Sequence, residues 1–356
     1  HELLIGKGKE NIMLNDNRFS RKEDGALMLV SVLPLISLSN SFALGLSAEE
    51  IFSSGVRMMR KIINIAFVVT IGVFQFGFDA SSAPIKFAAF GDYGENSNAS
   101  VRVASLVKSQ NPDFIVTTGD NNYPCGARET IDDNVGSHYS TYIYPYSGKY
   151  EKPVGEENRF FPCIGNHDLD SEDGEPYLDY FQFLKRARYY DFVKGSVHFF
   201  MLSSDQREPD GIEPDSKQLL WLKEGLHQSS SPWKIVVFHH PPYSSEIMVP
   251  PVEKQNFYTK NRERRIFVPL AEWGASAVLS GHIHVYERFD VGGIPYIISG
   301  LGGGQYRYEF IDKSPESEFR FSEEHGALFV EADEKSLQFK FMTVSKKVVD
   351  NLEVRK

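Results

Sequence analysis

Residues 85–94 read IKFAAFGDYG, an apolar run that ends in a glycine and an aspartate. Similar apolar runs followed by Asp, Asn or His occur in FIVTTGDNNY at 114–123, FFPCIGNHD at 160–168, IVVFHH at 235–240 and AVLSGHIH at 277–284, and all but IVVFHH have a glycine before that residue. Short runs of this composition are typical of buried strands. Each segment therefore predicts a strand followed at once by Asp, Asn or His, which are residue types that bind metal ions.

Further strands and helices alternate with these segments. Residues 198–202 and 296–299 also predict strands, whereas 99–108, 216–226 and 262–273 have helical spacing. Residues 327–330 and 337–342 predict a hairpin that closes a second sheet. Such alternation indicates a layered α/β domain.

Two long stretches, 121–158 and 243–261, have neither pattern and are interpreted as irregular rim loops. Four tyrosines in the first stretch either wall a substrate cleft or pack the loop onto the body of the domain. They are Tyr139, Tyr142, Tyr144 and Tyr146.

The acidic excess of the chain lies after residue 83. The formal net charge is −10, and the first 83 residues hold eight basic and eight acidic side chains, which leaves 30 basic against 40 acidic residues. Polymeric nucleic acid needs a basic surface, so we do not expect it as a partner. A small phosphorylated molecule is compatible with this charge, and nothing in the residues indicates the oligomeric state.

Residues 58–83 have the order of a secretory signal, with MMRK at 58–61, an apolar run at 62–78 and ASSA at 80–83. The alternative is a membrane anchor, because the run is just long enough to span a bilayer. The order of the three parts favours cleavage and a secreted or periplasmic protein. Membrane contact is expected only if 62–78 stays uncleaved. Residues 1–57 are either another targeting segment or translated sequence upstream of a start at Met58.

The chain has two cysteines, Cys125 and Cys163. If the protein is exported, they are expected either to form one disulfide or to remain partly buried thiols.

The five strand-end segments indicate a metal site only when they are considered together. A single Gly-Asp usually marks a turn, and a lone histidine is usually structural. Five such segments, each after its own strand, place ligand types where α/β sheets present their sites. The pair His282 and His284 needs a bend for both imidazoles to reach adjacent metal ions.

The order and spelling of the segments resemble the calcineurin-like metallophosphoesterase superfamily, and within it the purple acid phosphatase branch (tartrate-resistant acid phosphatase-like). The resemblance extends from about residue 86 to 304 and includes YER at 286–288. Most of the superfamily has a histidine where this chain has Gly94. Tyr123, three residues after Asp120, stands where the purple branch has a tyrosinate. The resemblance implies an α/β sandwich of two mixed β-sheets flanked by helices, formed as a single metallophosphoesterase domain by residues 84–356.

Carried over residue by residue, the resemblance implies two metal ions. A phenolate is a hard anionic donor that suits Fe(III), and the second ion is expected to be divalent Fe, Zn or Mn. The implied ligands are Asp92, Tyr123 and His284 for the ferric ion, Asn166, His239 and His282 for the divalent ion, and Asp120 as the bridge.

The implied activity is that of an acid phosphatase that cleaves phosphomonoesters by attack of a metal-bound hydroxide. His167 is the candidate that protonates the leaving oxygen. Asp168 either orients His167 or caps the loop. A further histidine that the family often has after the His239 segment is missing, so His240 substitutes, Glu246 acts instead, or His167 works alone.

Three other functions remain open. A phosphodiesterase or nucleotide hydrolase would use the same ligands with different rim loops. Redox chemistry at the iron is a second possibility, and a non-catalytic metal-bearing module is the third. His138 and His198 are interpreted as structural histidines.

Overall fold

The computed structural model describes residues 83–248, 254–255 and 266–356. The described residues belong to one compact unit, and residues 1–82 lie outside the described part of the chain. The predictions for residues 1–57 and for the 62–78 run therefore lie outside the described part of the chain. Among the described residues, no helix is long and apolar enough to cross a membrane.

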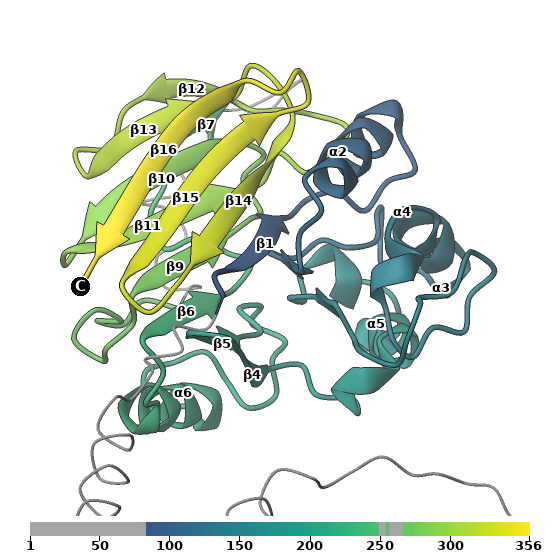
Figure 1. Cartoon of the computed structure of the whole chain (residues 1–356), viewed down its shortest axis with the longest axis horizontal. Coiled ribbons are helices and arrows are strands. Elements are labelled where there is room, and N and C mark those ends of the chain that lie inside the picture. Colours follow the sequence, from purple (N-terminus) through teal and green to yellow (C-terminus); the bar gives the residue numbers. More distant parts are fainter. Residues whose placement is uncertain (1–82, 249–253, 256–265) are drawn as a thin grey trace, which may run out of the picture. The chain divides into compact units, whose positions relative to one another are not determined.

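The first sheet has the strand order β16-β15-β14-β1-β2-β3. β1, β2 and β3 are parallel, whereas β14 is antiparallel to β1 and continues into the antiparallel strands β15 and β16 (Figure 1). The strands are β1 (Ile85–Phe90), β2 (Phe114–Thr117), β3 (Phe160–Phe161), β14 (Gly326–Ala332), β15 (Ser336–Thr343) and β16 (Val348–Arg355).

The second sheet has the order β13-β10-β11-β9-β6-β5-β4. Its centre is parallel, from β5 through β6 and β9 to β11, and antiparallel strands flank it on both sides. The strands are β4 (Tyr190–Lys194), β5 (Val197–Met201), β6 (Trp233–Val237), β9 (Ala277–Ser280), β10 (Tyr286–Val291), β11 (Ile294–Ser299) and β13 (Ser317–Phe321).

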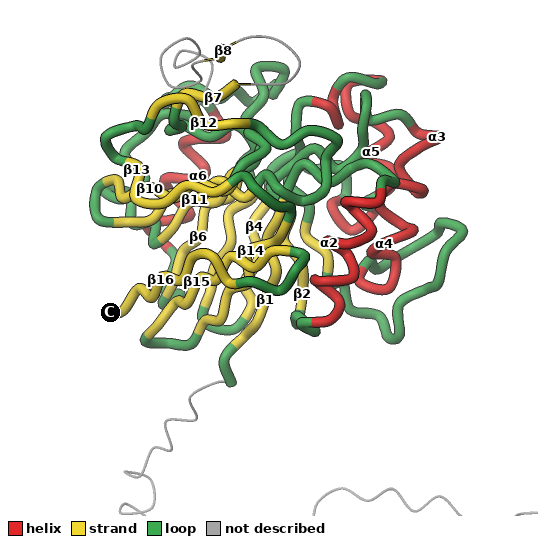
Figure 2. The backbone as a smooth tube through the Cα atoms, turned by 90° about the horizontal axis from the view of Figure 1, so that it is seen from above, coloured by secondary structure: helices red, strands yellow, loops and turns green. Residues whose placement is uncertain are grey.

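A small third sheet, β12-β7-β8, packs against the second sheet through Ile247 and Phe310. Its strands are β7 (Glu246–Met248), β8 (Lys254–Gln255) and β12 (Glu309–Asp312). The helices are α2 (Asn98–Ser109), α3 (Arg128–Ile131), α4 (Ser137–Tyr139), α5 (Glu175–Tyr180) and α6 (Lys217–Gln228). Seen from above, α2 to α5 lie together beside the strands of the first sheet (Figure 2).

The layers follow from the alternation of side chains along the strands. Phe87 and Ala89 of β1 point into the apolar core between the two large sheets, where they join residues of β5, β6 and β9. Ala88 and Phe90 point the other way and pack against α2. α6 covers the outer face of the second sheet through a leucine stripe that includes Leu222. Each large apolar side chain buried in this way contributes roughly 1.5–3 kcal/mol.

The predicted α/β sandwich of two mixed sheets flanked by helices is confirmed. The predicted strands are all present, but the hairpin of β14 and β15 extends the sheet that contains β1 instead of closing the other one. The helix predicted at 262–273 is wrong for its described part, since residues 266–269 have no regular structure and residues 270–274 form a single turn. Pro269 supplies no backbone N–H and disfavours helix before it.

The stretch 121–158 is not wholly irregular as predicted. It contains α3, a π-helical turn (Asp132–Gly136), α4 and a 3₁₀ turn (Ser140–Tyr142). Three of its four tyrosines pack into the apolar cluster outside the first sheet, at 1% exposure for Tyr139, 7% for Tyr142 and 8% for Tyr146. They therefore hold the loop onto the body, which is the second of the two predicted alternatives.

Both cysteines are free thiols in the structure. Cys163 is buried and donates to the Leu202 carbonyl at 3.2 Å, whereas Cys125 is half-buried and accepts from the Ser171 hydroxyl at 3.5 Å.

Candidate metal centre

Five parallel strands end at one edge, where the two large sheets approach each other. β1, β2 and β3 come from the first sheet, and β6 and β9 come from the second. The end of β1 is joined to the end of β11 because the Gly91 amide donates to the Ser299 carbonyl at 2.8 Å. Each predicted ligand segment follows one of these five strands, so the structure brings the segments together around one point.

Three predicted ligands have a left-handed backbone, with φ of 57° at Asp92, 53° at Asp120 and 67° at His282. This conformation costs an L-residue about 1–2 kcal/mol, and it persists where the surroundings impose it. The Asp92 amide donates to the Gly119 carbonyl at 3.0 Å. The His282 amide donates to both carboxylate oxygens of Asp92, at 2.9 and 3.1 Å. These bonds fix the strained turns.

The first half of the site consists of Asp92, Tyr123 and His284. The Tyr123 hydroxyl lies 3.4 Å from Asp92 Oδ1 and 3.2 Å from His284 Nε2. His284 Nδ1 donates to the Tyr306 carbonyl at 2.6 Å, which turns Nε2 toward the centre. Carboxylate, phenol and imidazole therefore converge on one point.

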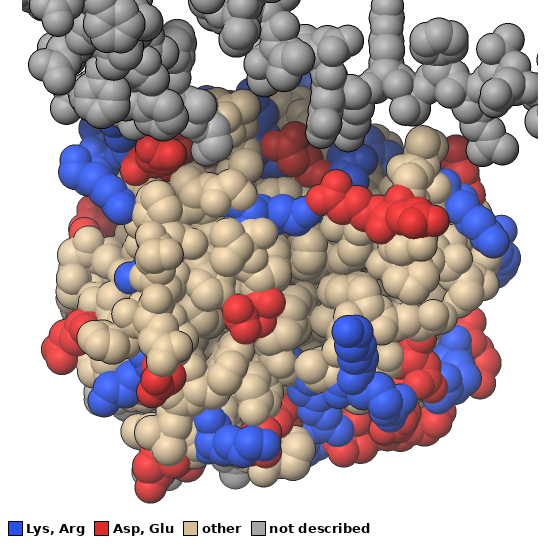
Figure 3. Space-filling model, turned by 60° about the horizontal axis from the view of Figure 1, so that its bottom comes forward, with Lys and Arg blue, Asp and Glu red and all other residues tan. Residues whose placement is uncertain are grey.

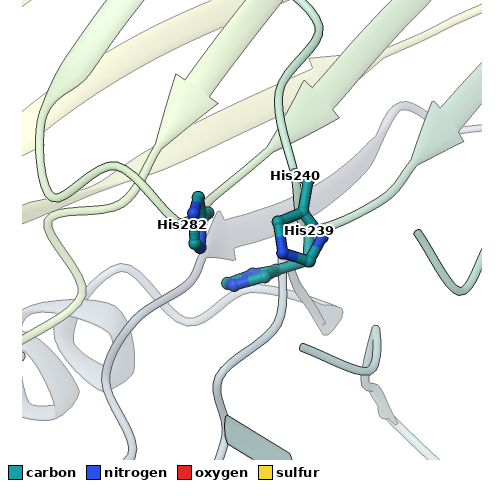
Figure 4. A group of neighbouring side chains, drawn as sticks. All are labelled: His239, His240 and His282. Carbon is teal, nitrogen blue, oxygen red and sulfur yellow. The ribbon is translucent and has the colours of Figure 1, made fainter. Parts of the chain in front are cut away.

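The second half consists of Asn166, His239 and His282. His239 Nε2 lies 3.1 Å from Asn166 Oδ1, and its Nδ1 donates to the Thr118 carbonyl at 2.8 Å. The rings of His239 and His282 are 5.0 Å apart. Figure 4 shows both rings, together with that of His240, facing one another from the loops after β6 and β9.

Asp120 lies between the two halves. Its Oδ2 accepts from the Tyr123 hydroxyl at 3.1 Å, and its Oδ1 is 3.3 Å from His239 Nε2. Donor atoms of Asp92, Asp120 and His239 lie within 4.8 Å of one another, as do those of His239, His240 and His282. All seven predicted ligands thus surround one small volume, with Asp120 shared by both halves.

Two glycines are needed because the backbone approaches the ligands closely. A Cβ at Gly165 would lie 2.2 Å from Asp120 Oδ1, and one at Gly119 would lie 2.3 Å from His239 Nδ1. Gly119 also has a φ of 98°, which side chains other than hydrogen rarely allow. The glycines before the ligands therefore serve both the turn and the packing of the site.

The donor set fits a pair of cations. Asp92 is 0% exposed and Asp120 is 2% exposed. In the part of the chain that the structure describes, neither carboxylate contacts a lysine or an arginine, and their neighbours are imidazoles, a phenol and backbone amides. Buried carboxylates are normally paired with cationic side chains or coordinate metals. With imidazole donors beside them, metal ions are the better match.

Residues 85–286 match the calcineurin-like phosphoesterase family. The chain belongs to the calcineurin-like phosphoesterase family. Among its curated relatives, purple acid phosphatase 22 of Arabidopsis thaliana is 28% identical over 276 residues, which cover 72% of this chain and 60% of that protein. Tartrate-resistant acid phosphatase type 5 of Homo sapiens is 25% identical over 259 residues, covering 63% of this chain and 74% of that protein.

The first four curated relatives are matched over only 46% to 62% of their own length. Among solved structures, purple acid phosphatase PPD1 from yellow lupin seeds has a TM-score of 0.58 at 16% identity, covering 77% of this chain and 54% of that one. GAP50, the anchor in the inner membrane complex of Plasmodium, has a TM-score of 0.55 at 17% identity, covering 77% and 89%. Both share the fold of this chain.

The electrostatics of this centre favour cation binding. Burial raises the pKa of the Tyr123 phenol well above its ordinary value, and the Asp120 and Asp92 carboxylates raise it further. Burial lowers the pKa of His239, but Asp120 outweighs this effect and the result is about 9. Protons and metal ions compete for these same lone pairs, so a bound cation is needed before Tyr123 ionises near neutral pH.

His167 lies at the opening of the site, with its side chain 37% exposed. Its amide donates to Asp120 Oδ1 at 3.0 Å, and its Nδ1 donates to the Pro124 carbonyl at 2.5 Å. Its ring packs edge-on against Tyr123, with centroids 4.7 Å apart. Nδ1 must carry a hydrogen to bond a carbonyl, and Nε2 is the nitrogen that faces the site, 4.0 Å from Asp120 Oδ2.

His240 faces the second half of the site. Its ring centroid is 4.4 Å from that of His282. The Ser204 hydroxyl accepts from the His240 amide at 2.9 Å and lies 3.0 Å from its Nδ1. Ser204 therefore fixes both the backbone and the ring of His240. The third residue considered for this role, Glu246, has a side chain outside the described part of the structure.

Asp168 does not contact His167 through its carboxylate. It is fully buried and accepts from the Asn121 amide, from Asn121 Nδ2 at 2.8 Å and from the Gly165 amide at 2.9 Å. Burial and the nearby Asp120 raise the pKa of Asp168 to about 7. Its geometry is that of a loop cap behind the ligands, and the carbonyl of Pro124 is the group that orients His167.

His138 and His198 lie away from the centre, as structural histidines do. His138 contacts the Ser100 hydroxyl at 3.3 Å, and His198 lies between Asp191 at 2.8 Å and Ser229 at 2.9 Å.

Several residues of the site were not predicted from the sequence. Ser204, Asp205 and Arg207 come from the loop after β5, which carries no metal-ligand motif. The available signal was that β5 precedes β6 and predicts a parallel neighbour, so polar residues after it reach the same edge. Tyr306, which orients His284, follows a glycine-rich segment that carries no such signal.

Proposed function

We propose that the protein is a dinuclear-metal phosphohydrolase, with Fe(III) in the first half of the site and divalent Fe, Zn or Mn in the second. The observation that carries this proposal is the position of the Tyr123 hydroxyl, 3.1 Å from Asp120, 3.2 Å from His284 and 3.4 Å from Asp92. A phenolate with two carboxylates is a hard anionic donor set, which suits Fe(III) better than a divalent ion.

Asp92, Tyr123, His284 and Asp120 would hold the ferric ion, and Asn166, His239, His282 and Asp120 the divalent ion. Such a metal pair supplies Lewis acidity toward a phosphoryl group and lowers the pKa of a water molecule, so that a nucleophile exists at ordinary pH. The chain itself brings each set of donors together from both large sheets and excludes water from Asp92 and Asp120.

His167 is proposed to protonate the leaving oxygen. Its Nδ1 hydrogen is held by Pro124, so Nε2 can donate only from the doubly protonated ring. We also propose activity in acid, because Fe(III) would lower the pKa of a bound water further than two divalent ions could. His240, held by Ser204, is the proposed second histidine that contacts the phosphoryl group.

A phosphomonoester is the preferred substrate in this proposal, and a phosphodiester or nucleotide is the alternative. On the face shown in Figure 3, basic side chains stand singly or beside acidic ones instead of forming a continuous basic surface. Together with the net charge of −10, this supports a small substrate over polymeric nucleic acid. We also propose export from the cytoplasm, which the order of residues 58–83 supports.

The test uses protein expressed from Met58 with iron and zinc present. Metal content and the visible spectrum are measured for wild type and Tyr123→Phe, and hydrolysis of p-nitrophenyl phosphate is compared with that of its bis ester. A tyrosinate-to-iron absorption that the variant lacks, with faster monoester cleavage, supports the proposal. Two divalent ions and no such absorption would overturn the ferric assignment, and faster cleavage of the bis ester would favour the diesterase alternative.

A further inference from the structure

Arg207 reaches from the loop after β5 to the turn that carries Asn166. Its Nη2 donates to the Asn166 carbonyl at 2.9 Å. Its Nη1 donates to Asp170 Oδ1 at 2.9 Å. Its Nε and Nη2 also form a fork with the two carboxylate oxygens of Asp205, at 2.8 and 3.0 Å. One guanidinium thus joins two loops, one that follows β3 of the first sheet and one that follows β5 of the second sheet.

The donors of Arg207 are almost fully used by the protein. A guanidinium has five N–H groups, and four of them have acceptors here. The side chain is 39% exposed, whereas that of Asp205 is only 13% exposed. Burial raises the pKa of Asp205, but Arg207 lowers it more and the net direction is downward. The pair is therefore ionised and its planar fork has a fixed direction.

Each end of this cluster reaches a histidine at the opening of the site. Asp170 Oδ2 lies 3.8 Å from His167 Nδ1. Asp205 directly follows Ser204, the residue that holds the amide and ring of His240. The loops of both candidate outer-sphere histidines are consequently joined through Arg207.

The second half of the site needs such support more than the first. Asn166 offers a neutral amide oxygen, which attracts a cation less than a carboxylate does, so its contribution depends on being held in place. The Asn166 carbonyl otherwise accepts only the Leu169 amide, at 3.2 Å, among the described contacts. The bond from Arg207 is the shorter of the two and is charge-assisted.

We propose that Arg207 is a positioning residue for the second metal ion. It holds the turn that presents Asn166 and His167, and it fastens this turn to the loop that holds His240. It acts through these residues and does not touch the substrate. This inference rests on the proposed function only in so far as the second half of the site binds a divalent ion.

The test measures how firmly that ion is held. Holoprotein with iron and zinc is dialysed against a zinc chelator, and both metals are measured over time for wild type, Arg207→Gln and Arg207→Lys. We expect Arg207→Gln to bind zinc about 10- to 100-fold more weakly, the range typical when a ligand loses its supporting partner. Iron and its tyrosinate absorption should remain. Arg207→Lys should lie between, because an ammonium group cannot form the fork.

Arg186→Gln is the matched control, because Arg186 is another surface arginine that pairs with two carboxylates, those of Glu175 and Asp179. It should leave both metals in place. In Arg207→Gln, kcat for p-nitrophenyl phosphate at limiting zinc should fall while KM stays within about twofold, since Arg207 makes no substrate contact. Thermal unfolding reports whether each variant is folded.

Two results would overturn the inference. One is zinc retention in Arg207→Gln equal to that of wild type and Arg186→Gln. The other is equal loss of iron and zinc, which indicates a general structural role. If Arg207→Gln does not fold, Arg207→Lys and Asp205→Asn decide the matter by the same split between the metals. A wild type that retains both ions but cleaves no phosphoester would overturn the proposed function and leave this comparison intact.

Discussion

The two halves of the metal centre are built from different chemistry. In the first half, Asp92 and Tyr123 offer anionic oxygens, and the His284 ring stacks on Tyr308 with centroids 4.5 Å apart and an interplanar angle of 6°. The second half offers one neutral amide and two imidazoles. Apart from the shared Asp120, the charged group bonded to this half is Arg207, which donates to the Asn166 carbonyl and pairs with Asp170 and Asp205.

This difference indicates that the two halves bind different metal ions with different affinities. With an ionised Tyr123, the first half and Asp120 together carry three negative charges, whereas the second half has only the charge of Asp120. A hard ion of high charge belongs with the first set, and a borderline divalent ion belongs with the imidazoles. The first ion should therefore exchange slowly and the second should exchange more readily.

The largest expected effect comes from removing what both halves share. Asp120→Ala should lose both ions and lower kcat/KM by more than about 10³-fold, beyond the roughly 10- to 100-fold effect of losing a supporting partner. Metal analysis and phosphatase assays check this. Asp215→Ala, at an exposed aspartate, is the control. An Asp120→Ala protein that keeps either ion at full occupancy would show that the carboxylate does not bridge.

The next largest effect is the selective loss of one metal ion when a ligand of only one half is replaced. Tyr123→Phe should abolish the tyrosinate absorption and weaken iron while zinc remains. Asn166→Ala should release zinc while the absorption remains. Each should lower kcat by about 10- to 100-fold. Spectra and metal content of the two proteins, measured side by side, decide the point. Loss of both metals in each variant would mean that the halves are not independent.

Which residues gather at the centre could be predicted from the sequence because each one lies just after a strand. Asp92 and His239 need only the strand and the turn after it, and both features are local. Arg207 and Tyr308 reach the centre from loops whose paths depend on how the sheets pack, so no local pattern marks them. The same limit explains residues 266–273, where apolar spacing suggested a helix but Pro269 and tertiary contacts leave a single turn.

A smaller effect is expected on stability at Gly119, where the backbone lies close to His239 of the second half. Gly119→Ala should destabilise the fold by about 1–2 kcal/mol through its positive φ and by about 1–3 kcal/mol more through overlap with His239. Gly155→Ala is the matched control, because Gly155 has a φ of 91° but an added methyl group there would have nothing within 4 Å. Urea unfolding gives both values. If both variants lose the same free energy of unfolding, overlap with His239 does not contribute to the cost of Gly119→Ala.

The smallest expected effect comes from His325, which lies beside the first half of the site, and it depends on pH. His325 Nε2 donates to the Gly304 carbonyl at 3.1 Å, and the Gly304 amide donates to the Asp92 carbonyl at 2.7 Å. Burial lowers the pKa of His325 to about 4. Between pH 4 and the ordinary histidine value of about 6.5, the unfolded chain therefore binds more protons than the folded one.

Stability should consequently fall as pH drops through this window, by at most about 1.4 kcal/mol per pH unit from this residue. His325→Gln should remove that part of the slope, and His227→Gln, at an exposed histidine, should not. Urea unfolding at pH 4.5, 5.5 and 7 measures the slopes. If His325 also steadies the first half through Gly304, the variant should weaken the tyrosinate absorption in acid while zinc retention is unchanged. If His325→Gln changes neither the pH dependence of the free energy of unfolding nor the absorption, His325 does not support the first half of the site.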